Sequence, residues 1–268
     1  MNFSELIKKI KEVKIQGAKN IARAGIMAMS MKSFNEANLL RTRPTEPALR
    51  NALEYAKRFG QKEALKHFEI SKKKIKQFGY KKVKRRVFTH CHSGTVMEVL
   101  KEAKCRGKKF EVVYTETRPL YQGRKTAFDL RKYKIKSTMI IDSAIGSFLE
   151  KNNPSIKETV VMIGADAVIK DGGVINKIGS NMLAELAYNH KIPVYVVTDA
   201  WKFSLKNVKL EERGYKEIWM RAPGNIRIKN PSFEKVNSKY IVGIISELGV
   251  LKPKEFVKKV IHVYPWIR

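Results

Sequence analysis

The hydrophobic positions in the first 68 or so residues recur at the spacing of helices. Leu6, Ile7 and Ile10 fall on one helical face, and residues 21–31 are rich in alanine and methionine. Residues 46–59 place Ala48, Leu49, Ala52, Leu53 and Ala56 on a single side. The alternation typical of strands is absent here, so this part of the chain is predicted to be helical.

The start of the helix over 46–59 has its own signal. Pro44 and Pro47 lie on either side of Thr45 and Glu46. Proline is tolerated in the first turn of a helix, where no backbone donor is lost, and threonine is a good cap. We therefore expect the helix to begin here, with Thr45 as its cap.

After residue 86 short β-branched or apolar segments alternate with helical ones. Strands are expected at 87–89, 110–115, 138–141, 159–163 and 194–198. Helices are expected at 95–105, 122–131, 144–151 and 180–189. Such alternation predicts a parallel sheet with helices on both faces. The predicted class is α/β, with a helical N-terminal domain (1–84) followed by a Rossmann-like, doubly wound parallel sheet domain (85–268).

Composition narrows the class of protein. The chain has 268 residues, 43% of them hydrophobic, which excludes disorder over its whole length. Cys91 and Cys105 are its two cysteines, and no charged-then-apolar leader begins it, so a secreted disulfide scaffold is not expected. No apolar run approaches the ~20 residues that span a bilayer. We expect a cytoplasmic protein without a membrane segment.

The charge is strongly positive: 55 Lys and Arg against 25 Asp and Glu give a formal +30. Residues 1–86 hold 23 basic and 7 acidic residues, hence +16, and the rest of the chain holds +14. The densest run, 72–86, flanks Phe78 and Tyr80, as a single-strand binding surface does. No nucleic-acid motif accompanies the run, so we interpret it as a solvated basic linker that binds nucleic acid only non-specifically.

Polar residues follow the predicted strands, where ligands of parallel sheets bind. Cys91 comes where the first strand gives way to a helix, a place that favours an anion and could lower the pKa of its thiol. Cys91 is either a catalytic group, as an acid/base or a nucleophile, or an unreactive residue that only packs in the interior. His90 and His92 indicate a metal site only weakly, because no third ligand is identified. Solvent-facing histidines at a capped helix start are the simpler interpretation.

The end of the first strand carries a second candidate, and the end of the strand at 159–163 carries another. Ser93-Gly94-Thr95 can hold a phosphate at a helix N-terminus or can be an ordinary cap. Asp166 follows an apolar strand, where a carboxyl with a raised pKa can act as general acid or base; otherwise it caps the next segment.

Several cations are also available. Asn176 and Lys177 can hold a hydroxyl and a phosphate or can merely finish a hairpin, and Arg43 and Lys202 are further candidates for phosphates. The glycines form neither a P-loop nor a dinucleotide fingerprint, so NAD and ATP are unsupported as cofactors.

Five segments occur in a fixed order along the chain: Arg43-Pro44-Thr45, Thr89-His90-Cys91, Glu116-Thr117-Arg118-Pro119-x-x-Gln122-Gly123, Gly164-Ala165-Asp166 and Asn176-Lys177-Ile178-Gly179. Together they resemble the superfamily of archaeal ribose-1,5-bisphosphate isomerase, methylthioribose-1-phosphate isomerase and the regulatory subunits of translation initiation factor 2B. The resemblance runs from about residue 17 to residue 249.

The resemblance implies a helical domain on a Rossmann-like domain, and homodimers or hexamers built from dimers. It places the acid/base chemistry on Cys91 and Asp166 and implies no metal and no cofactor. The substrate contacts that it implies are Gln16, Gly17, Ala18, Lys19, Arg43, Ser93, Gly94, Thr95, Gln122, Asn176, Lys177 and Lys202.

The presence of both Cys91 and Asp166 favours the enzymes of this superfamily over its regulatory subunits, which generally lack the pair. The compact length favours the ribose bisphosphate branch, which implies an aldose–ketose isomerase that converts ribose 1,5-bisphosphate to ribulose 1,5-bisphosphate in nucleotide salvage. Two departures keep alternatives open. The family's Arg-Gly-Ala has Gln16 in place of its arginine, and Gly94 stands where many members of that branch have lysine. The alternatives are a non-catalytic initiation-factor-like subunit and a methylthioribose-1-phosphate isomerase.

Overall fold

Among the described residues, five helices precede the first strand, which confirms that this part of the chain is helical. The computed structural model describes residues 2–12, 14–15, 17–149 and 156–267. The helices are α1 (Phe3–Lys11), α2 (Ala18–Ala28), α3 (Glu36–Arg41), α4 (Pro47–Phe59) and α5 (Gln61–Gly79). The predicted apolar face of α4 is buried, and it packs chiefly against α2 and α5. Phe3, Leu6, Ile21, Leu39 and Leu53 belong to the apolar core that α1 to α4 share.

The beginning of α4 differs from the prediction in one respect. Pro47 occupies the first turn, as expected, but the cap residue is Glu46, whose side chain makes no capping hydrogen bond. Thr45 lies one residue earlier, and its hydroxyl donates instead to the carbonyl oxygen of Lys209, 2.7 Å away. The prediction that Thr45 caps the helix is therefore wrong, because a tertiary contact takes its hydroxyl.

The basic run is not a solvated linker over its first half. Residues 72–79 form the last turns of α5, which lies along α6 (Gly94–Cys105). Lys72 Nζ lies 3.1 Å from a carboxylate oxygen of Glu98, and Lys76 Nζ lies 2.9 Å from one of Glu102. Part of the charge that first indicated nucleic acid thus pairs with carboxylates of the neighbouring helix.

A seven-stranded sheet forms the centre of the rest of the molecule and confirms the predicted α/β class. Its order is β11-β10-β7-β4-β1-β2-β3, and every pair is parallel except β10 with β11. The strands are β1 (Arg86–Thr89), β2 (Glu111–Thr115), β3 (Lys136–Ile140), β4 (Thr159–Ile163), β7 (Val194–Val197), β10 (Gly243–Ser246) and β11 (Gly249–Leu251). The chain order reverses beside β1, and ligands bind at such switch points.

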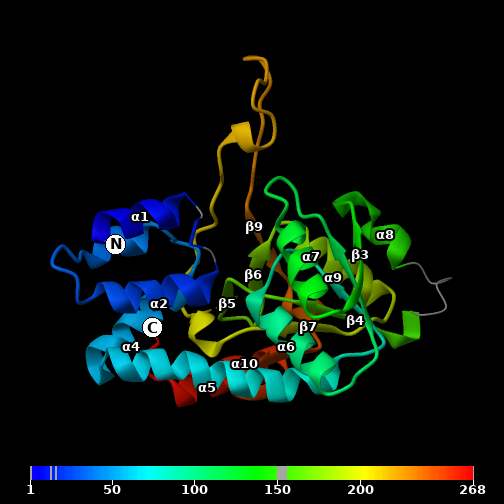
Figure 1. The fold of residues 1–268 in the computed structure, drawn as a ribbon, viewed down its shortest axis with the longest axis horizontal. Coiled ribbons are helices and arrows are strands. Elements are labelled where there is room, and N and C mark those ends of the chain that lie inside the picture. Colours follow the sequence, from blue (N-terminus) through cyan, green and yellow to red (C-terminus); the bar gives the residue numbers. More distant parts are fainter. Residues whose placement is uncertain (1, 13, 16, 150–155, 268) are drawn as a thin grey trace.

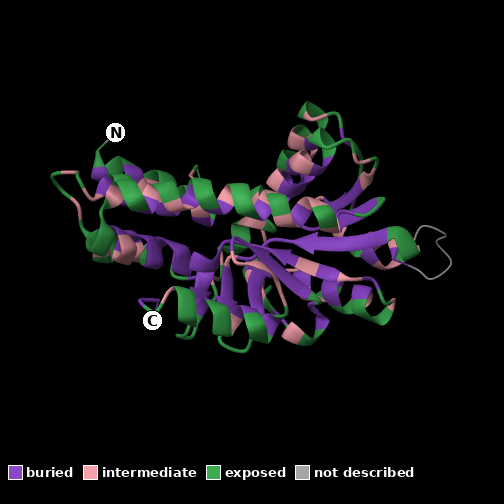
Figure 2. Ribbon diagram, turned by 90° about the horizontal axis from the view of Figure 1, so that it is seen from below, coloured by how far each residue is buried: buried purple, intermediate pink, exposed green. Residues whose placement is uncertain are grey.

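Helices cover both faces of this sheet (Figure 2). Val87 and Val160 face a core shared with α5, α6 and α7 (Gln122–Lys132). Phe88 and Val161 face the opposite core, shared with α9 (Ser180–Asn189) and α10 (Pro253–Val263). Successive strand residues point to opposite faces, so the central strands β1 and β4 are buried on both sides and are largely apolar.

A second, four-stranded sheet was not predicted. Its order is β8-β5-β6-β9, and it consists of β5 (Ala167–Ile169), β6 (Val174–Lys177), β8 (Phe203–Ser204) and β9 (Phe233–Val236). A turn at Asp171-Gly172-Gly173 joins β5 to β6 in an antiparallel hairpin. Between β8 and β9 the segment 205–232, which we call the arm, projects away from the body (Figure 1).

The helix expected at 144–151 is shorter in the structure. A 3₁₀ turn at Asp142–Ala144 leads into α8 (Ile145–Phe148), and residues 150 and 151 lie outside the described residues. Further 3₁₀ turns are Tyr80–Lys82, Ile156–Glu158, Ala200–Lys202, Tyr215–Glu217 and Ser238–Tyr240. Within the described part of the chain, no helix is long and apolar enough to cross a membrane.

Candidate active site

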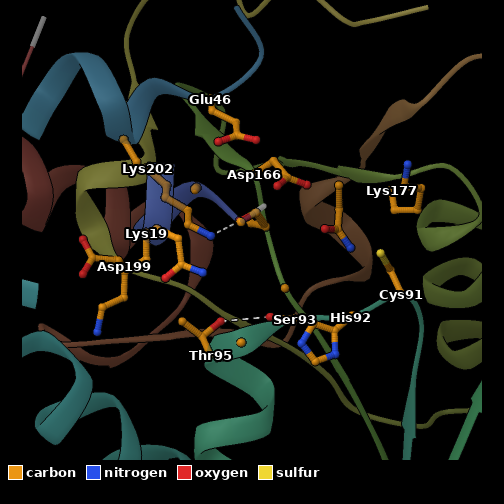
Figure 3. A pocket seen from close by; sticks show the side chains of 18 of the residues that line it. Lys19, Glu46, Cys91, His92, Ser93, Thr95, Asp166, Lys177, Asp199 and Lys202 are labelled. Atoms are coloured by element: carbon orange, nitrogen blue, oxygen red, sulfur yellow. Dashed lines mark hydrogen bonds between the residues drawn. The ribbon is translucent and has the colours of Figure 1, made fainter. Parts of the chain in front are cut away.

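A cavity of about 380 Å³ lies where the N-terminal helices meet the carboxyl ends of the strands. Figure 3 shows side chains from both parts of the molecule directed into it. It is lined by every described residue to which the sequence assigns a role: Gly17, Ala18, Lys19, Arg43, Cys91, Ser93, Gly94, Thr95, Gln122, Asp166, Asn176, Lys177 and Lys202. Gln16 lies outside the described residues.

Cys91 directly follows β1 in a backbone conformation that L-residues rarely adopt, with φ at 63°. The turn is held from both sides: its backbone N–H donates to Thr117 Oγ1 at 3.0 Å, and Thr126 Oγ1 donates to its carbonyl oxygen at 3.3 Å. Unfavourable backbone of this kind persists where surrounding contacts enforce it, often at functional sites.

The expected lowering of the Cys91 pKa is wrong. Burial raises the pKa of the thiol to about 11, and the positive charge of Lys177 only partly opposes that effect. At neutral pH the thiol form of Cys91 therefore predominates.

Asp166 follows β4 at the start of the second sheet. Its backbone N–H donates to the carbonyl oxygen of Ile175 at 2.8 Å, which fixes the residue against β6. Burial raises the pKa of its carboxyl, and the cations Lys202, Lys177 and Arg43 oppose the rise. The direction is the one expected for a carboxyl after an apolar strand.

The two histidines beside Cys91 are not solvent-facing, contrary to the prediction. His90 is 2% exposed, and its ring nitrogens lie 2.6 Å from Thr115 Oγ1 and 2.7 Å from the carbonyl oxygen of Ile178. His92 is largely enclosed, and its Nδ1 lies 3.1 Å from Thr126 Oγ1. These rings brace the turn around Cys91.

The N-terminus of α6 opens on the cavity. Ser93 is the cap, and its Oγ accepts from the N–H of Val96 at 3.4 Å and lies 3.0 Å from Thr95 Oγ1. Gly164 at the end of β4 makes this approach possible, because a Cβ there would lie 2.5 Å from Ser93 Oγ. Unpaired backbone donors and the helix dipole make such a terminus suited to an anion.

Three buried cations lie around the carboxyl of Asp166. Lys177, at the end of β6, is 7% exposed, and its Nζ lies 5.1 Å from the ring centre of Phe233. Lys202 Nζ donates to the carbonyl oxygen of Ala165 at 2.5 Å. Arg43 is partly neutralised, because its Nη1 lies 3.3 Å from a carboxylate oxygen of Glu211 on the arm.

The remaining predicted contacts also line the cavity. Gly17 caps α2 with a φ of 84°, which favours glycine, and Lys19 donates to the carbonyl oxygen of Phe68 at 3.3 Å. Gln122 begins α7, and its buried Oε1 has no hydrogen-bond partner among the described residues. Asn176 Nδ2 donates to Ser180 Oγ at 2.8 Å, which fixes the amide at the start of α9.

Sequence reasoning missed several charged residues that line the cavity, among them Glu46, Glu211 and Arg213. Glu46 lies at the start of α4, and Glu211 and Arg213 lie at the base of the arm. Glu46 directly follows the Arg43-Pro44-Thr45 segment, so its position next to that segment was a usable signal. Glu211 and Arg213 carried no such signal, because the sequence predicts no helix or strand in that part of the chain.

A further group of polar side chains includes Asp199, which also lines the cavity. Asp199, which follows β7, lies 3.1 Å from His67 Nε2 of α5 and accepts a hydrogen bond from Ser71 Oγ. Glu247 completes a group of three side chains spaced closely enough for a metal, and no other such group occurs within the described ranges. Since His67 pairs with Asp199, and Ser71 Oγ lies within hydrogen-bond distance of both Asp199 and Glu247, we interpret the group as an ion-pair contact between α5 and the sheet and name it the His67–Asp199–Glu247 cluster.

Comparison with known proteins identifies the family. The profile described as "Initiation factor 2 subunit family" matches residues 27–253, most of the chain. The chain belongs to the initiation factor 2 subunit family. Within that family, a ribose 1,5-bisphosphate isomerase of Archaeoglobus fulgidus is 32% identical, over 93% of this chain and 90% of that protein.

Other members of the initiation factor 2 subunit family carry different names. A methylthioribose-1-phosphate isomerase of Fervidobacterium nodosum is 36% identical, over 65% of this chain and 54% of that protein. A crystal structure of a Pyrococcus horikoshii translation initiation factor eIF-2B aligns with a TM-score of 0.81 at 29% identity, over 93% of this chain and 96% of that one. The family is therefore shared by enzymes and translation factors.

Proposed function

We propose that this protein is an isomerase that converts ribose 1,5-bisphosphate to ribulose 1,5-bisphosphate. One observation carries the proposal: Cys91 and Asp166 line the same cavity, together with three buried cations and an open helix N-terminus. The similarity to the Archaeoglobus fulgidus enzyme, over nearly the full length of both chains, supports this choice of substrate. A sugar bisphosphate substrate of this kind fits a role in nucleotide salvage.

The reaction opens the ribose ring and moves one hydrogen. Asp166, protonated, gives its proton to the ring oxygen as the bond between that oxygen and C1 breaks. The Cys91 thiolate removes the proton from C2, and the resulting enediol-type intermediate takes that proton back at C1. A proton from the C2 hydroxyl returns to Asp166 as the ketone forms. Electrons stay within the substrate, so the reaction needs no redox cofactor.

The two phosphates have separate candidate sites in this proposal. Ser93, Gly94 and Thr95 offer backbone donors and hydroxyls at the start of α6, with Lys19 nearby. Lys177, Lys202 and Arg43 supply positive charge around Asp166. Asn176 and Gln122 then remain for the sugar hydroxyls.

The test is parallel incubation of the purified protein with ribose 1,5-bisphosphate and with methylthioribose 1-phosphate, followed by an assay for ketose. We expect rapid ketose formation from ribose 1,5-bisphosphate and little from the second compound. Preferential turnover of methylthioribose 1-phosphate would transfer the assignment to that branch. If neither compound reacts, the protein is instead a non-catalytic, initiation-factor-like subunit, and the isomerase proposal fails.

We also propose that the protein works as a homodimer or as a hexamer built from dimers. The arm supports this, because a projecting segment with many exposed apolar side chains is typical of an interaction surface. These side chains are Leu210, Tyr215, Ile218, Trp219, Met220 and Ile226. Light scattering after gel filtration should give two or six times the chain mass, whereas the mass of a single chain would contradict the proposal.

A further inference from the structure

Buried polar atoms without partners gather in the part of the cavity where the start of α4 meets the base of the arm. Glu46 is 7% exposed and Ser232 is 3% exposed, and both line the cavity. Within the described part of the chain, Glu46 Oε2, Glu211 Oε1 and Ser232 Oγ have no hydrogen-bond partner. The same holds for Arg43 Nε. Unpaired buried polar atoms are costly, so this group indicates a ligand that supplies the missing hydrogen bonds.

Contacts within the chain hold these four residues next to one another. At the base of the arm, the backbone N–H of Ser232 donates to the carbonyl oxygen of Glu211 at 3.0 Å. A carboxylate oxygen of Glu211 lies 3.3 Å from Arg43 Nη1, and the backbone N–H of Glu46 donates to the carbonyl oxygen of Arg43 at 3.2 Å. We call Arg43, Glu46, Glu211 and Ser232 the arm-base subsite.

The unpaired atoms of the arm-base subsite select the chemistry of its ligand. The oxygens of an ionised phosphate only accept hydrogen bonds, so they cannot pair with the carboxylate oxygen of Glu211. A cationic ligand is disfavoured, because the charges of Arg43 and Lys202 already act on Glu46. A hydroxyl both donates and accepts, so it pairs with Glu211 Oε1, with Arg43 Nε and with the carboxyl of Glu46 in either protonation state.

We propose that the arm-base subsite binds the C3 hydroxyl of the sugar, and that Glu46 and Glu211 are specificity-determining residues that reject substrates without this hydroxyl. The proposal rests on the proposed function, because it says which part of ribose 1,5-bisphosphate enters the subsite. The ring form of that sugar has two free hydroxyls, at C2 and at C3. The C2 hydroxyl belongs to the reacting carbon, beside Cys91 and Asp166, so the C3 hydroxyl is the one left for the subsite.

The analogue 3-deoxyribose 1,5-bisphosphate isolates this contact. It keeps both phosphates and the hydrogen at C2, so it remains chemically able to isomerise. In the complex, however, it leaves the carboxyl oxygens of Glu46 and Glu211 unpaired in a closed site. Sites that hydrogen-bond a substrate hydroxyl discriminate strongly against analogues that lack it, so kcat/KM for ribose 1,5-bisphosphate should exceed that for the analogue by about 10²-fold or more.

The test is the ratio of kcat/KM for the two sugars in wild type, E46A and E211A. Each substitution should lower the ratio by at least about tenfold. The ratio separates recognition from damage, because a general structural defect lowers kcat/KM for both sugars alike. E54A and E212A are the matched controls and should keep the wild-type ratio. Glu54 lies on α4 and pairs at the surface with Arg58, and Glu212 is the exposed neighbour of Glu211.

A ratio near one in wild type would overturn the proposal. So would a wild-type ratio in either E46A or E211A. E46Q and E211Q keep an accepting carbonyl oxygen in the same place, so both should retain most of the preference for the C3 hydroxyl. If one alanine variant does not fold, the wild-type ratio and the other variant decide.

Binding without turnover separates the arm-base subsite from the isomerase function. Calorimetric titration of C91S, which should form no ketose, gives Kd for each of the two sugars. Binding of ribose 1,5-bisphosphate that is tighter by about tenfold or more, and loses this preference when E46A is added, upholds the subsite. It does so even if the wild-type protein forms no ketose, and then only the isomerase function is rejected. Equal binding of the two sugars overturns the subsite alone, and binding of neither sugar overturns both.

Discussion

Replacing Cys91 by serine, or Asp166 by asparagine, is expected to lower kcat for ribose 1,5-bisphosphate by about 10² to 10⁴-fold. A serine hydroxyl is a far weaker acid than a thiol and cannot supply the base that removes the C2 proton. Asparagine has no acidic proton for the ring oxygen. The measurement is the initial rate of ketose formation at saturating substrate.

Matched controls separate these effects from general damage. Cys105 is exposed on α6, and Asp171 is an exposed turn residue that pairs with Lys235. C105S and D171N should therefore keep the wild-type rate. The thermal transitions of C91S and D166N should also stay close to that of wild type, since both side chains lie at the cavity wall. A wild-type rate in either C91S or D166N would refute the role assigned to that residue.

The largest expected effect on stability comes from the His67–Asp199–Glu247 cluster. D199N should lower the free energy of unfolding by about 3 kcal/mol near pH 5, because it leaves a buried His67 without its counter-charge. Burial opposes the charge on His67, but Asp199 outweighs it and raises the pKa of the ring above 6.5. Burial also opposes the charge on Asp199. The charge of His67, with hydrogen bonds from Ser71 and the backbone N–H of Trp201, nevertheless lowers the pKa of Asp199 to about 2.

The signs of these shifts define a pH window. The contribution of His67 is complete below pH 6.5 and is lost as pH rises through its raised pKa. The stabilisation that Asp199 contributes is complete above pH 3.8 and is lost as pH falls through about 2. Burial, followed by the charge of Asp199, raises the pKa of Glu247 to about 7, which also favours mildly acidic pH.

Urea unfolding of wild type and D199N at pH 5 and pH 8.5 measures this window. The difference between the two proteins should be large at pH 5 and clearly smaller at pH 8.5. E158Q, which removes an exposed partner of Arg85, is the control and should change stability by less than about 1 kcal/mol at either pH. A D199N effect that is equal at both pH values would show that the ion pair does not contribute.

The fold could be predicted from the sequence where the pattern is local. The apolar spacing on α4 and the β-branched runs of β1 and β4 are properties of neighbouring residues, and the structure confirms these elements. The short strands β5, β6, β8 and β9 could not be found in the same way. Each has two to four residues, and β8 and β9 are separated in sequence by the whole arm.

The candidate site was predictable as far as it depends on the ends of parallel strands. That rule, with the quoted motifs, named residues that the structure brings to one cavity. Burial was not predictable, because it depends on what covers each residue. The pKa of Cys91 rises instead of falling, and His90 is enclosed by Thr115 and Ile178 from two other segments. Glu46 lines the same cavity as Asp166 only because α4 packs against the sheet domain.

The most direct test of the central claim is a time course by carbon-13 NMR with ribose 1,5-bisphosphate labelled at C2, in deuterated water. The account predicts that the labelled carbon moves to the ketone region of the spectrum, at a rate that falls by at least about 10²-fold in C91S and in D166N. Persistence of the sugar resonance with wild-type protein, or a wild-type rate of ketone formation in either variant, would contradict it.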